Sequence, residues 1–195
     1  MLQNTINVPD FILDVANGPS VTLSELWREH YLLLWLSRGL ACPFCRRQIM
    51  QLTQIQDEIQ NQNTQVILIA HTELEQARSM LQYYPVPWPY ACDPGRRAAT
   101  AYGFDAPQGP LAGMVSNLKE QSRAWRVLLQ HPGEPHPEVL PAVKAAGHPA
   151  AANGGMVIID RSGQVRFRLA SGKLALLPAN DIILGALRQV VGAGP

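Results

Sequence analysis

Residues 31–47 read YLLLWLSRGLACPFCRR, and this stretch decides the expected fold class. Its first part, Tyr31–Leu36, is a short and continuous apolar run, which is typical of a strand buried on both faces. Beyond Cys42, apolar residues recur at helical spacing as far as Ile59, which predicts an amphipathic helix of about five turns. The apolar run Val66–Ala70 follows. This order of strand, helix and strand predicts a right-handed βαβ unit with parallel strands and therefore an α/β fold.

Both ends of the chain predict further elements around this unit. A turn cluster at Asn17–Ser20 separates two extended stretches, which indicates a small N-terminal hairpin. Near the other end, the turn Asp160–Gly163 lies between the apolar run Met156–Ile159 and the alternating stretch Gln164–Leu169. This pattern is typical of an antiparallel hairpin. Apolar positions between residues 182 and 191 then mark a terminal amphipathic helix.

The middle of the chain is less regular. Trp88–Cys92 is a short strand bounded by prolines, and it is expected near an edge of the sheet. From Phe104 to Ala152 the composition shifts toward Pro, Gly, Ala and His, with one helix expected between about residues 116 and 130. This segment has too few large apolar residues for a core of its own. We therefore interpret residues 104–152 as an insertion within a single domain that spans residues 1–195.

Composition limits the range of functions. The chain has 195 residues, of which 47% are hydrophobic, and its 16 Lys and Arg nearly balance its 15 Asp and Glu. Such a balance gives no electrostatic field strong enough to bind a nucleic acid or an anionic membrane, so neither is expected as a partner. The first residues lack the cationic and apolar regions of a secretory signal, and no apolar run approaches the roughly 20 residues that span a bilayer. These features predict a cytoplasmic protein.

The chemistry is expected at a pair of cysteines. Three cysteines are too few for a disulfide framework, and a close pair in a reducing compartment is more often catalytic or metal-binding. Cys42 and Cys45 form such a pair, and their spacing on a first helical turn places the two sulfurs within disulfide reach. Cys92 is interpreted as a small buried hydrophobe rather than as an alternative resolving cysteine.

Cys42 is expected to be the reactive thiol. It follows the buried strand and opens the helix, with Pro43 at the first helical position, where a missing N–H costs nothing. We expect this geometry to expose the sulfur and to favour its thiolate form through the helix dipole. Lowering a thiol pKa by two units requires roughly 2.7 kcal/mol, whereas the dipole supplies up to about 2 kcal/mol. A nearby cation must contribute, and the candidates are Arg38, Arg46 and Arg47.

Two other interpretations of the pair remain open. The first is a zinc site that combines Cys42 and Cys45 with His131 and His136, although the two halves are far apart and the histidines lie in a proline-rich stretch. The second is a pair of buried structural thiols. Neither is favoured over redox chemistry, so no metal and no cofactor are expected.

Several motifs together resemble a known family, the peroxiredoxin-like branch of the alkyl hydroperoxide reductase and thiol-specific antioxidant superfamily. The motifs that carry this resemblance are, in chain order, Pro9–Phe11, Leu23–Trp27, Cys42–Arg46, Asp93–Pro94, Ala101–Gly103 and Gly154–Gly163. Each motif is short, and their order and spacing make the match specific.

The resemblance implies a thioredoxin-like fold, with a central mixed sheet flanked by helices. It implies that Cys42 attacks a hydroperoxide or disulfide substrate, that Cys45 resolves the product as an intramolecular disulfide, and that a thioredoxin- or glutathione-type reductant restores the pair. A homodimer is a further expectation. The positions expected to bind substrate or activate the thiolate are Arg38, Gly39, Pro43, Phe44 and Arg46.

The chain also departs from this family pattern. Typical peroxiredoxins have Pro and Thr at the positions that hold Trp35 and Gly39 here, and an arginine just before the strand at Met156–Ile159. Arg38 or Arg46 is expected to substitute for these activating groups. The alternative functions are reduction of protein disulfides or of an organic endoperoxide, and a non-catalytic redox-sensing module.

Overall fold

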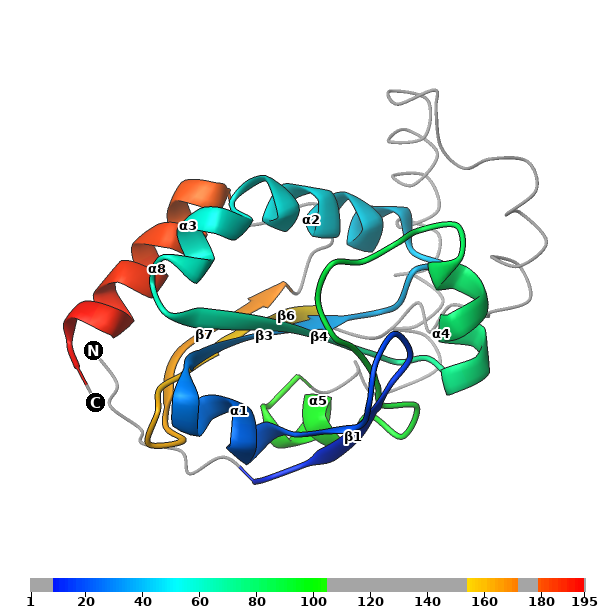
Figure 1. Cartoon of the computed structure of the whole chain (residues 1–195), viewed down its shortest axis with the longest axis horizontal. Helices are drawn as coiled ribbons and strands as arrows, with labels where there is room; N and C mark the ends of the chain where they lie inside the picture. The colour runs from blue at the N-terminus through cyan, green and yellow to red at the C-terminus, as the bar shows by residue number, and fades with distance from the viewer. Residues whose placement is uncertain (1–8, 105–153, 172–178, 195) are drawn as a thin grey trace, which may run out of the picture.

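The computed structural model describes residues 9–104, 154–171 and 179–194, and within these residues seven strands form one mixed sheet with helices on both faces (Figure 1). The strands are β1 (Ile12–Val15), β2 (Val21–Thr22), β3 (Tyr31–Ser37), β4 (Thr64–Ala70), β5 (Tyr90–Cys92), β6 (Gly154–Ile159) and β7 (Val165–Ser171). The helices are α1 (Leu23–Glu29), α2 (Pro43–Gln54), α3 (Gln56–Gln60), α4 (Leu74–Leu81), α5 (Arg97–Ala101) and α8 (Asn180–Gly192).

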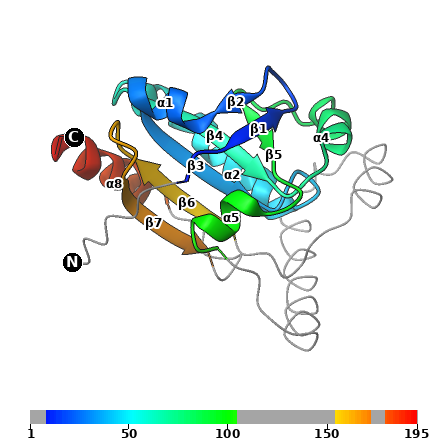
Figure 2. The ribbon, with the colours of Figure 1, turned by 90° about the horizontal axis from the view of Figure 1, so that it is seen from below.

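The strand order is β2-β1-β5-β4-β3-β6-β7, which Figure 2 shows across the width of the sheet. β3 lies near the centre, paired in parallel with β4 and antiparallel with β6. All seven of its residues are buried. The sheet separates two hydrophobic cores, and alternate side chains of β3 pack into one or the other. The first core also contains side chains of α2, α3, α4 and α8, and the second contains side chains of α1 and α5. The predicted α/β class, the parallel βαβ unit and both hairpins are confirmed.

Two predictions about the elements are wrong. The expected long helix is divided, because Ile55 leaves helical geometry at φ −114° and ψ 21° between α2 and α3. This break keeps both Ile55 and Ile59 buried in the core. The strand at β5 is not at an edge, because it pairs with β4 on one side and β1 on the other. Its prolines precede Tyr90, so they remove no N–H from the strand itself.

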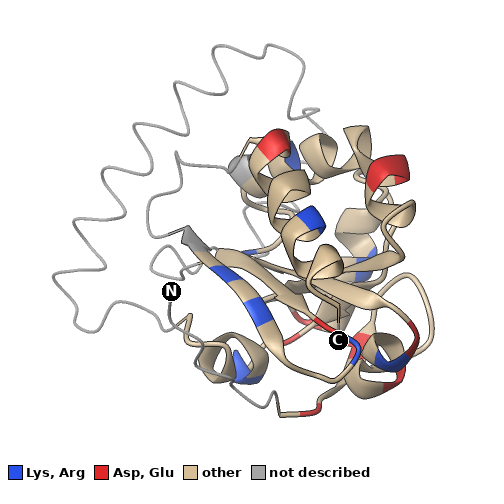
Figure 3. Cartoon of the chain, turned by 90° about the vertical axis from the view of Figure 1, so that its left-hand side faces the viewer, with Lys and Arg blue, Asp and Glu red and all other residues tan. Residues whose placement is uncertain are grey.

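The expected insertion lies almost wholly outside the described residues. Only Phe104 of residues 104–152 is described, and its side chain is fully buried. Acidic and basic residues are interspersed over the described elements in Figure 3, in keeping with the near balance of charge in the sequence.

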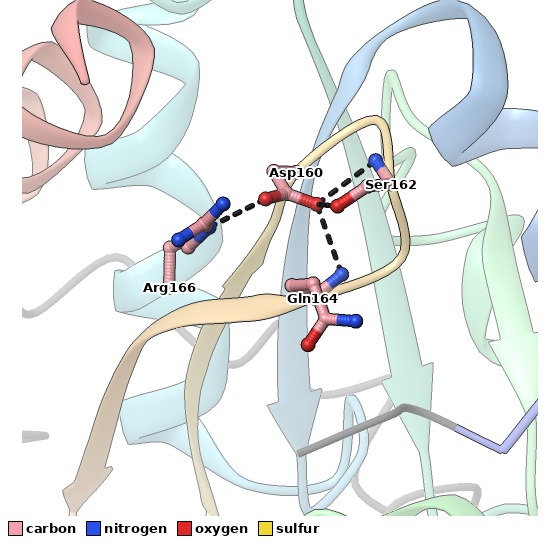
Figure 4. Close-up of polar contacts among 4 residues, drawn as sticks. All are labelled: Asp160, Ser162, Gln164 and Arg166. Carbon is pink, nitrogen blue, oxygen red and sulfur yellow. Dashed lines mark hydrogen bonds and ion pairs between the residues drawn. The ribbon is translucent and has the colours of Figure 1, made fainter. Parts of the chain in front are cut away.

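The β6–β7 hairpin is organised by a buried carboxylate, Asp160 (Figure 4). One carboxylate oxygen accepts hydrogen bonds from the backbone N–H groups of Ser162 and Gln164 and from the Ser162 hydroxyl, and the other accepts one from Arg166 Nε at 2.5 Å. Burial alone would raise the pKa of Asp160, but these hydrogen bonds outweigh it and lower the pKa. The carboxylate therefore stabilises the turn that the sequence predicts.

Replacing this carboxylate should destabilise the protein in a pH-dependent way. Asp160→Asn should lower the free energy of unfolding at neutral pH by about 2–3 kcal/mol, because it removes a buried charge-assisted pair and turns an acceptor into a donor. Because folding lowers the pKa of Asp160, its carboxylate stabilises the native protein at any pH above the pKa that Asp160 has in the unfolded chain. This stabilisation is lost as the pH falls through the pKa that Asp160 has in the native protein. Urea unfolding from neutral pH to below about pH 4 should therefore show the two proteins converging. An exposed control, Asp14→Asn, should change the free energy of unfolding little. A difference in the free energy of unfolding between Asp160→Asn and the wild type that stays constant with pH would contradict this account.

Candidate active site

The loop at the carboxyl end of β3 positions the cysteine pair. It runs from Arg38 to Cys42, where α2 begins, and the Cys42 N–H donates to the Gly39 carbonyl at 3.1 Å. Gly39 has φ +106°, and a Cβ there would lie 2.7 Å from Thr72 Oγ1. Only glycine adopts this conformation without strain, so Gly39 shapes the loop that brings Cys42 to the helix start.

Both sulfurs are buried in this loop. Cys42 is 0% exposed and Cys45 is 3% exposed. The expectation that the strand-to-helix junction exposes Cys42 is therefore wrong. The physical reason is that Arg38, itself only 4% exposed, folds back onto the sulfur and donates from Nη2 to Cys42 Sγ at 3.0 Å. Reaction with a substrate thus requires local opening of the loop or of the first turn of α2.

Each thiol affects the ionisation of the other. The pKa of Cys45 is lowered to about 6, first by a hydrogen bond from Cys42 and then by the Arg38 charge, the Ser37 hydroxyl and the Arg38 backbone N–H, against the opposing effect of burial. Burial and the adjacent Cys45 raise the pKa of Cys42, and Arg38 offsets part of this rise. Within this buried pair the pKa of Cys42 is therefore raised, which contradicts the expectation from the sequence that the helix start lowers it.

The structure separates the roles of the three candidate arginines. Arg38 is the arginine that donates to Cys42 Sγ. Arg46 is also buried, but it donates to the Leu40 carbonyl at 2.7 Å and its guanidinium lies 4.7 Å from the centre of the Tyr84 ring. These contacts brace the loop before the cysteines. Arg47 is exposed on α2.

Two further predicted site residues, Pro43 and Phe44, form the first turn of α2. Their side chains lie outside the described part of the structure, so their expected roles stay predictions. Ser37 was missed by the sequence analysis, although it is the one polar residue in a strand that is otherwise apolar. That departure from the pattern is the signal that could have identified it.

An apolar groove beside the site was also missed. It consists of two adjoining hollows of about 570 and 240 Å³ that share Ile49, Met50, Pro85 and Val86. The smaller hollow reaches Leu40 in the active-site loop. Its walls come from α2 and from the proline-rich segment before β5, which are far apart in the chain. No local sequence pattern could have indicated that they meet.

The third cysteine is set apart from this chemistry. Cys92 is buried at the end of β5, and burial together with the acidic Asp14 and Glu73 raises its pKa to about 11, against a smaller opposing effect of Arg78. It is protonated at neutral pH and packs as the small hydrophobe that the sequence predicted.

The described residues hold no group of three or more His, Cys, Asp or Glu side chains that could bind a metal ion. The two histidines of the zinc alternative, His131 and His136, lie outside those residues. In the part of the chain that is described, no helix has the length and apolar character needed to cross a membrane.

Comparisons with known proteins place this geometry in context. The chain resembles a peroxidoxin, BcpB, from Mycobacterium tuberculosis (TM-score 0.64, 14% identity, covering 97% of this chain and 99% of that one). It also resembles a yeast mitochondrial 1-Cys peroxiredoxin (TM-score 0.65, 13% identity, covering 99% of this chain and 79% of that one). A third similar structure is a protein of Chlorobium tepidum described as a putative thiol:disulfide interchange protein DsbE (TM-score 0.57, 18% identity, covering 98% of this chain and 99% of that one). At these identities the likeness shows the fold alone, and it confirms the thioredoxin-like fold. No curated protein matches the chain in sequence.

Family membership rests on the sequence itself. The model of the AhpC/TSA family matches residues 6–168, which include both cysteines of the pair, the active-site loop, β6 and the first part of β7. The chain therefore belongs to the AhpC/TSA family and is a thiol-dependent oxidoreductase.

Proposed function

We propose that the protein reduces hydroperoxides with Cys42 as the attacking sulfur and Cys45 as the resolving sulfur. The observation that carries this proposal is the contact of Arg38 Nη2 with Cys42 Sγ at 3.0 Å, at the start of the helix that also carries Cys45 on its first turn. A cation and a helix N-terminus both favour a thiolate at Cys42 once the site opens. Cys45 lies one turn further along the helix, in position to close a disulfide.

The proposed reaction proceeds in two steps. In the first, the Cys42 thiolate attacks an oxygen of the hydroperoxide, the O–O bond breaks, and the alkoxide leaves as an alcohol after taking a proton. Cys42 becomes a sulfenic acid. In the second, the Cys45 thiolate attacks the Cys42 sulfur, a disulfide forms, and the hydroxide that leaves is protonated to water. A thiol reductant then returns two electrons to the disulfide.

The apolar groove favours an organic hydroperoxide as substrate. Its walls are mainly apolar side chains from α2 and from residues 83–87, and its smaller hollow reaches Leu40 within the active-site loop. An alkyl chain in this groove would bury apolar surface that hydrogen peroxide does not have. We therefore propose a preference for alkyl hydroperoxides.

Reduction of protein disulfides is the second candidate function. The observation that favours it is the Cys-x-x-Cys pair itself, in which a disulfide can form and be exchanged without any partner cysteine. Reduction of an organic endoperoxide would use the same pair. A redox-sensing module would also contain it, but would oxidise slowly.

The decisive experiment treats the fully reduced protein with one equivalent of an alkyl hydroperoxide and maps the products by mass spectrometry. We expect rapid loss of two thiols and a single disulfide that joins Cys42 to Cys45. Cys92→Ser should behave identically, because Cys92 is buried and protonated. Fast turnover of insulin disulfides with slow consumption of hydroperoxide would instead favour the second candidate. A Cys42–Cys45 linkage that never forms would end the proposal.

The remaining expectations concern partners and location. The cycle requires a thioredoxin- or glutathione-type reductant, and a cytoplasmic thiol pool supplies such donors, so a cytoplasmic location is part of the proposal. A homodimer is also proposed. Turnover with each reductant system, cell fractionation and analytical ultracentrifugation test these three points.

Loss of the Arg38 charge should slow oxidation of Cys42. Arg38→Met should lower the second-order rate constant with an alkyl hydroperoxide by about 10- to 100-fold, because a charge-assisted hydrogen bond contributes about 1.5–3 kcal/mol. Stopped-flow measurement under single-turnover conditions would give this rate directly. Arg38→Lys should recover part of the loss, and the exposed Arg47→Met should match the wild type. Equal rates for Arg38→Met and Arg47→Met would contradict the role given to Arg38.

A further inference from the structure

Tyr90 ends in a buried hydroxyl that the fold leaves without a hydrogen bond. Its side chain is 0% exposed and lies in the core that also contains α2. Within the described residues, no group is placed to accept from or donate to its hydroxyl oxygen in hydrogen-bond geometry. A buried hydroxyl without a partner destabilises a protein, so such groups are rare and are often explained by function. Tyr90 therefore carries a donor that folding alone does not use.

This hydroxyl faces the active-site loop. A Cβ at Gly39 would lie 3.8 Å from the Tyr90 hydroxyl oxygen and 2.7 Å from Thr72 Oγ1. Tyr90 begins β5, and Thr72 follows the end of β4. Gly39 has no side chain of its own to offer a substrate, and its carbonyl accepts the Cys42 N–H at 3.1 Å. Two hydroxyl groups from neighbouring strands thus converge on the residue that positions the attacking sulfur.

The Tyr90 hydroxyl is a donor at neutral pH. Burial raises its pKa, and the nearby Thr72 hydroxyl offsets only part of this rise. The phenol therefore keeps its proton and can donate one hydrogen bond. A hydroperoxide has the matching chemistry, because both of its oxygens accept hydrogen bonds and one of them becomes negatively charged when the O–O bond breaks.

We propose that the hydroxyls of Tyr90 and Thr72 bind the two oxygens of the hydroperoxide beside Gly39 when the active-site loop opens. This inference rests on the proposed function of Cys42. Its thiolate forms a bond to the terminal oxygen and is oxidised to a sulfenic acid, while the electron pair of the O–O bond moves to the leaving oxygen. The Tyr90 hydroxyl donates to the alkoxide that forms there and stabilises its charge. The alkoxide then takes a proton from water, so both hydroxyls are unchanged at the end of the step.

The test compares two reactions of the same sulfur. Cys45→Ser combined with Cys92→Ser leaves Cys42 as the only thiol. In this background, Tyr90→Phe should lower the second-order rate constant with an alkyl hydroperoxide by about 10-fold in stopped flow, the effect of one lost hydrogen bond. The rate of alkylation by iodoacetamide should stay the same, because that reagent has no peroxide oxygen to bind. Equal losses in both reactions would overturn the proposal, because Tyr90 would then act on the thiol or the loop.

Tyr102→Phe is the matched control. The Tyr102 hydroxyl is also buried without a partner among the described residues, but it lies in the other core, with α1 and α5. Its loss should change neither rate. Both substitutions remove an unsatisfied hydroxyl, so neither should lower the Tm. A lower Tm for Tyr90→Phe would show that the folded protein already uses this hydroxyl, and would overturn the proposal.

Thr72→Val decides the question even if Tyr90→Phe fails to fold. Valine keeps the shape of the side chain beside Gly39 and removes only the hydroxyl. The rate with the hydroperoxide should fall by about 10-fold while alkylation is unchanged, and an unchanged rate with the hydroperoxide would overturn the proposal. A wild type that reacts with the hydroperoxide no faster than free cysteine would reject the proposed function and this inference together. A fast wild type that Tyr90→Phe matches would reject the inference alone.

Discussion

Cys42→Ser should abolish oxidation of the protein by hydroperoxides. This variant lacks the sulfur that contacts Arg38, and only the buried Cys45 remains on the first turn of α2. Loss of an attacking nucleophile of this kind typically costs roughly three orders of magnitude or more in rate. The rate constant, measured by stopped flow with the reduced protein in excess, should therefore fall to the background of the buried thiols that remain.

Cys45→Ser is the matched comparison, and it should behave differently. This variant keeps the attacking sulfur but has nothing to resolve the intermediate, so a sulfenic acid should accumulate on Cys42, detectable by a dimedone adduct in mass spectrometry. The reverse pattern, with an inactive Cys45→Ser and an adduct on Cys45 in Cys42→Ser, would show that the two sulfurs exchange roles.

Gly155→Ala should be among the most destabilising single-methyl additions in the chain. Gly155 lies in β6 between Leu36 of β3 and Ala170 of β7. A Cβ at this position would collide with the Phe104 ring and lie 2.5 Å from the Leu169 carbonyl oxygen, which is backbone and has little freedom to move. We expect a loss of about 3 kcal/mol or more in the free energy of unfolding, typical of severe overpacking.

Thermal unfolding provides the measurement. A loss of this size should lower the Tm by roughly 6–12 °C for a protein of this length. Gly185→Ala is the control, because a Cβ there meets nothing within 4 Å on α8, and it should raise stability slightly by replacing glycine in a helix. Equal Tm values for the two variants would mean that the Phe104 ring and β7 move aside without cost.

The sequence alone was sufficient for the central unit and for the location of the chemistry. Strands buried on both faces must be apolar throughout, so β3 and β4 are visible as continuous apolar runs, and the amphipathic pattern between them marks α2. The Cys-x-x-Cys spacing is local, and the first helical turn brings the two sulfurs together regardless of the rest of the fold. Turn residues such as Asp160 are visible for the same reason.

Only the tertiary structure decided how the site is arranged. Arg38 and Arg46 are equally distant from Cys42 in sequence, but their side chains point in different directions, one toward Cys42 and the other over Tyr84. The need for glycine at position 155 depends on Phe104, about 50 residues away in the chain. Sequence periodicity records which face of an element is buried, whereas contacts between distant segments and side-chain directions are set only when the chain packs.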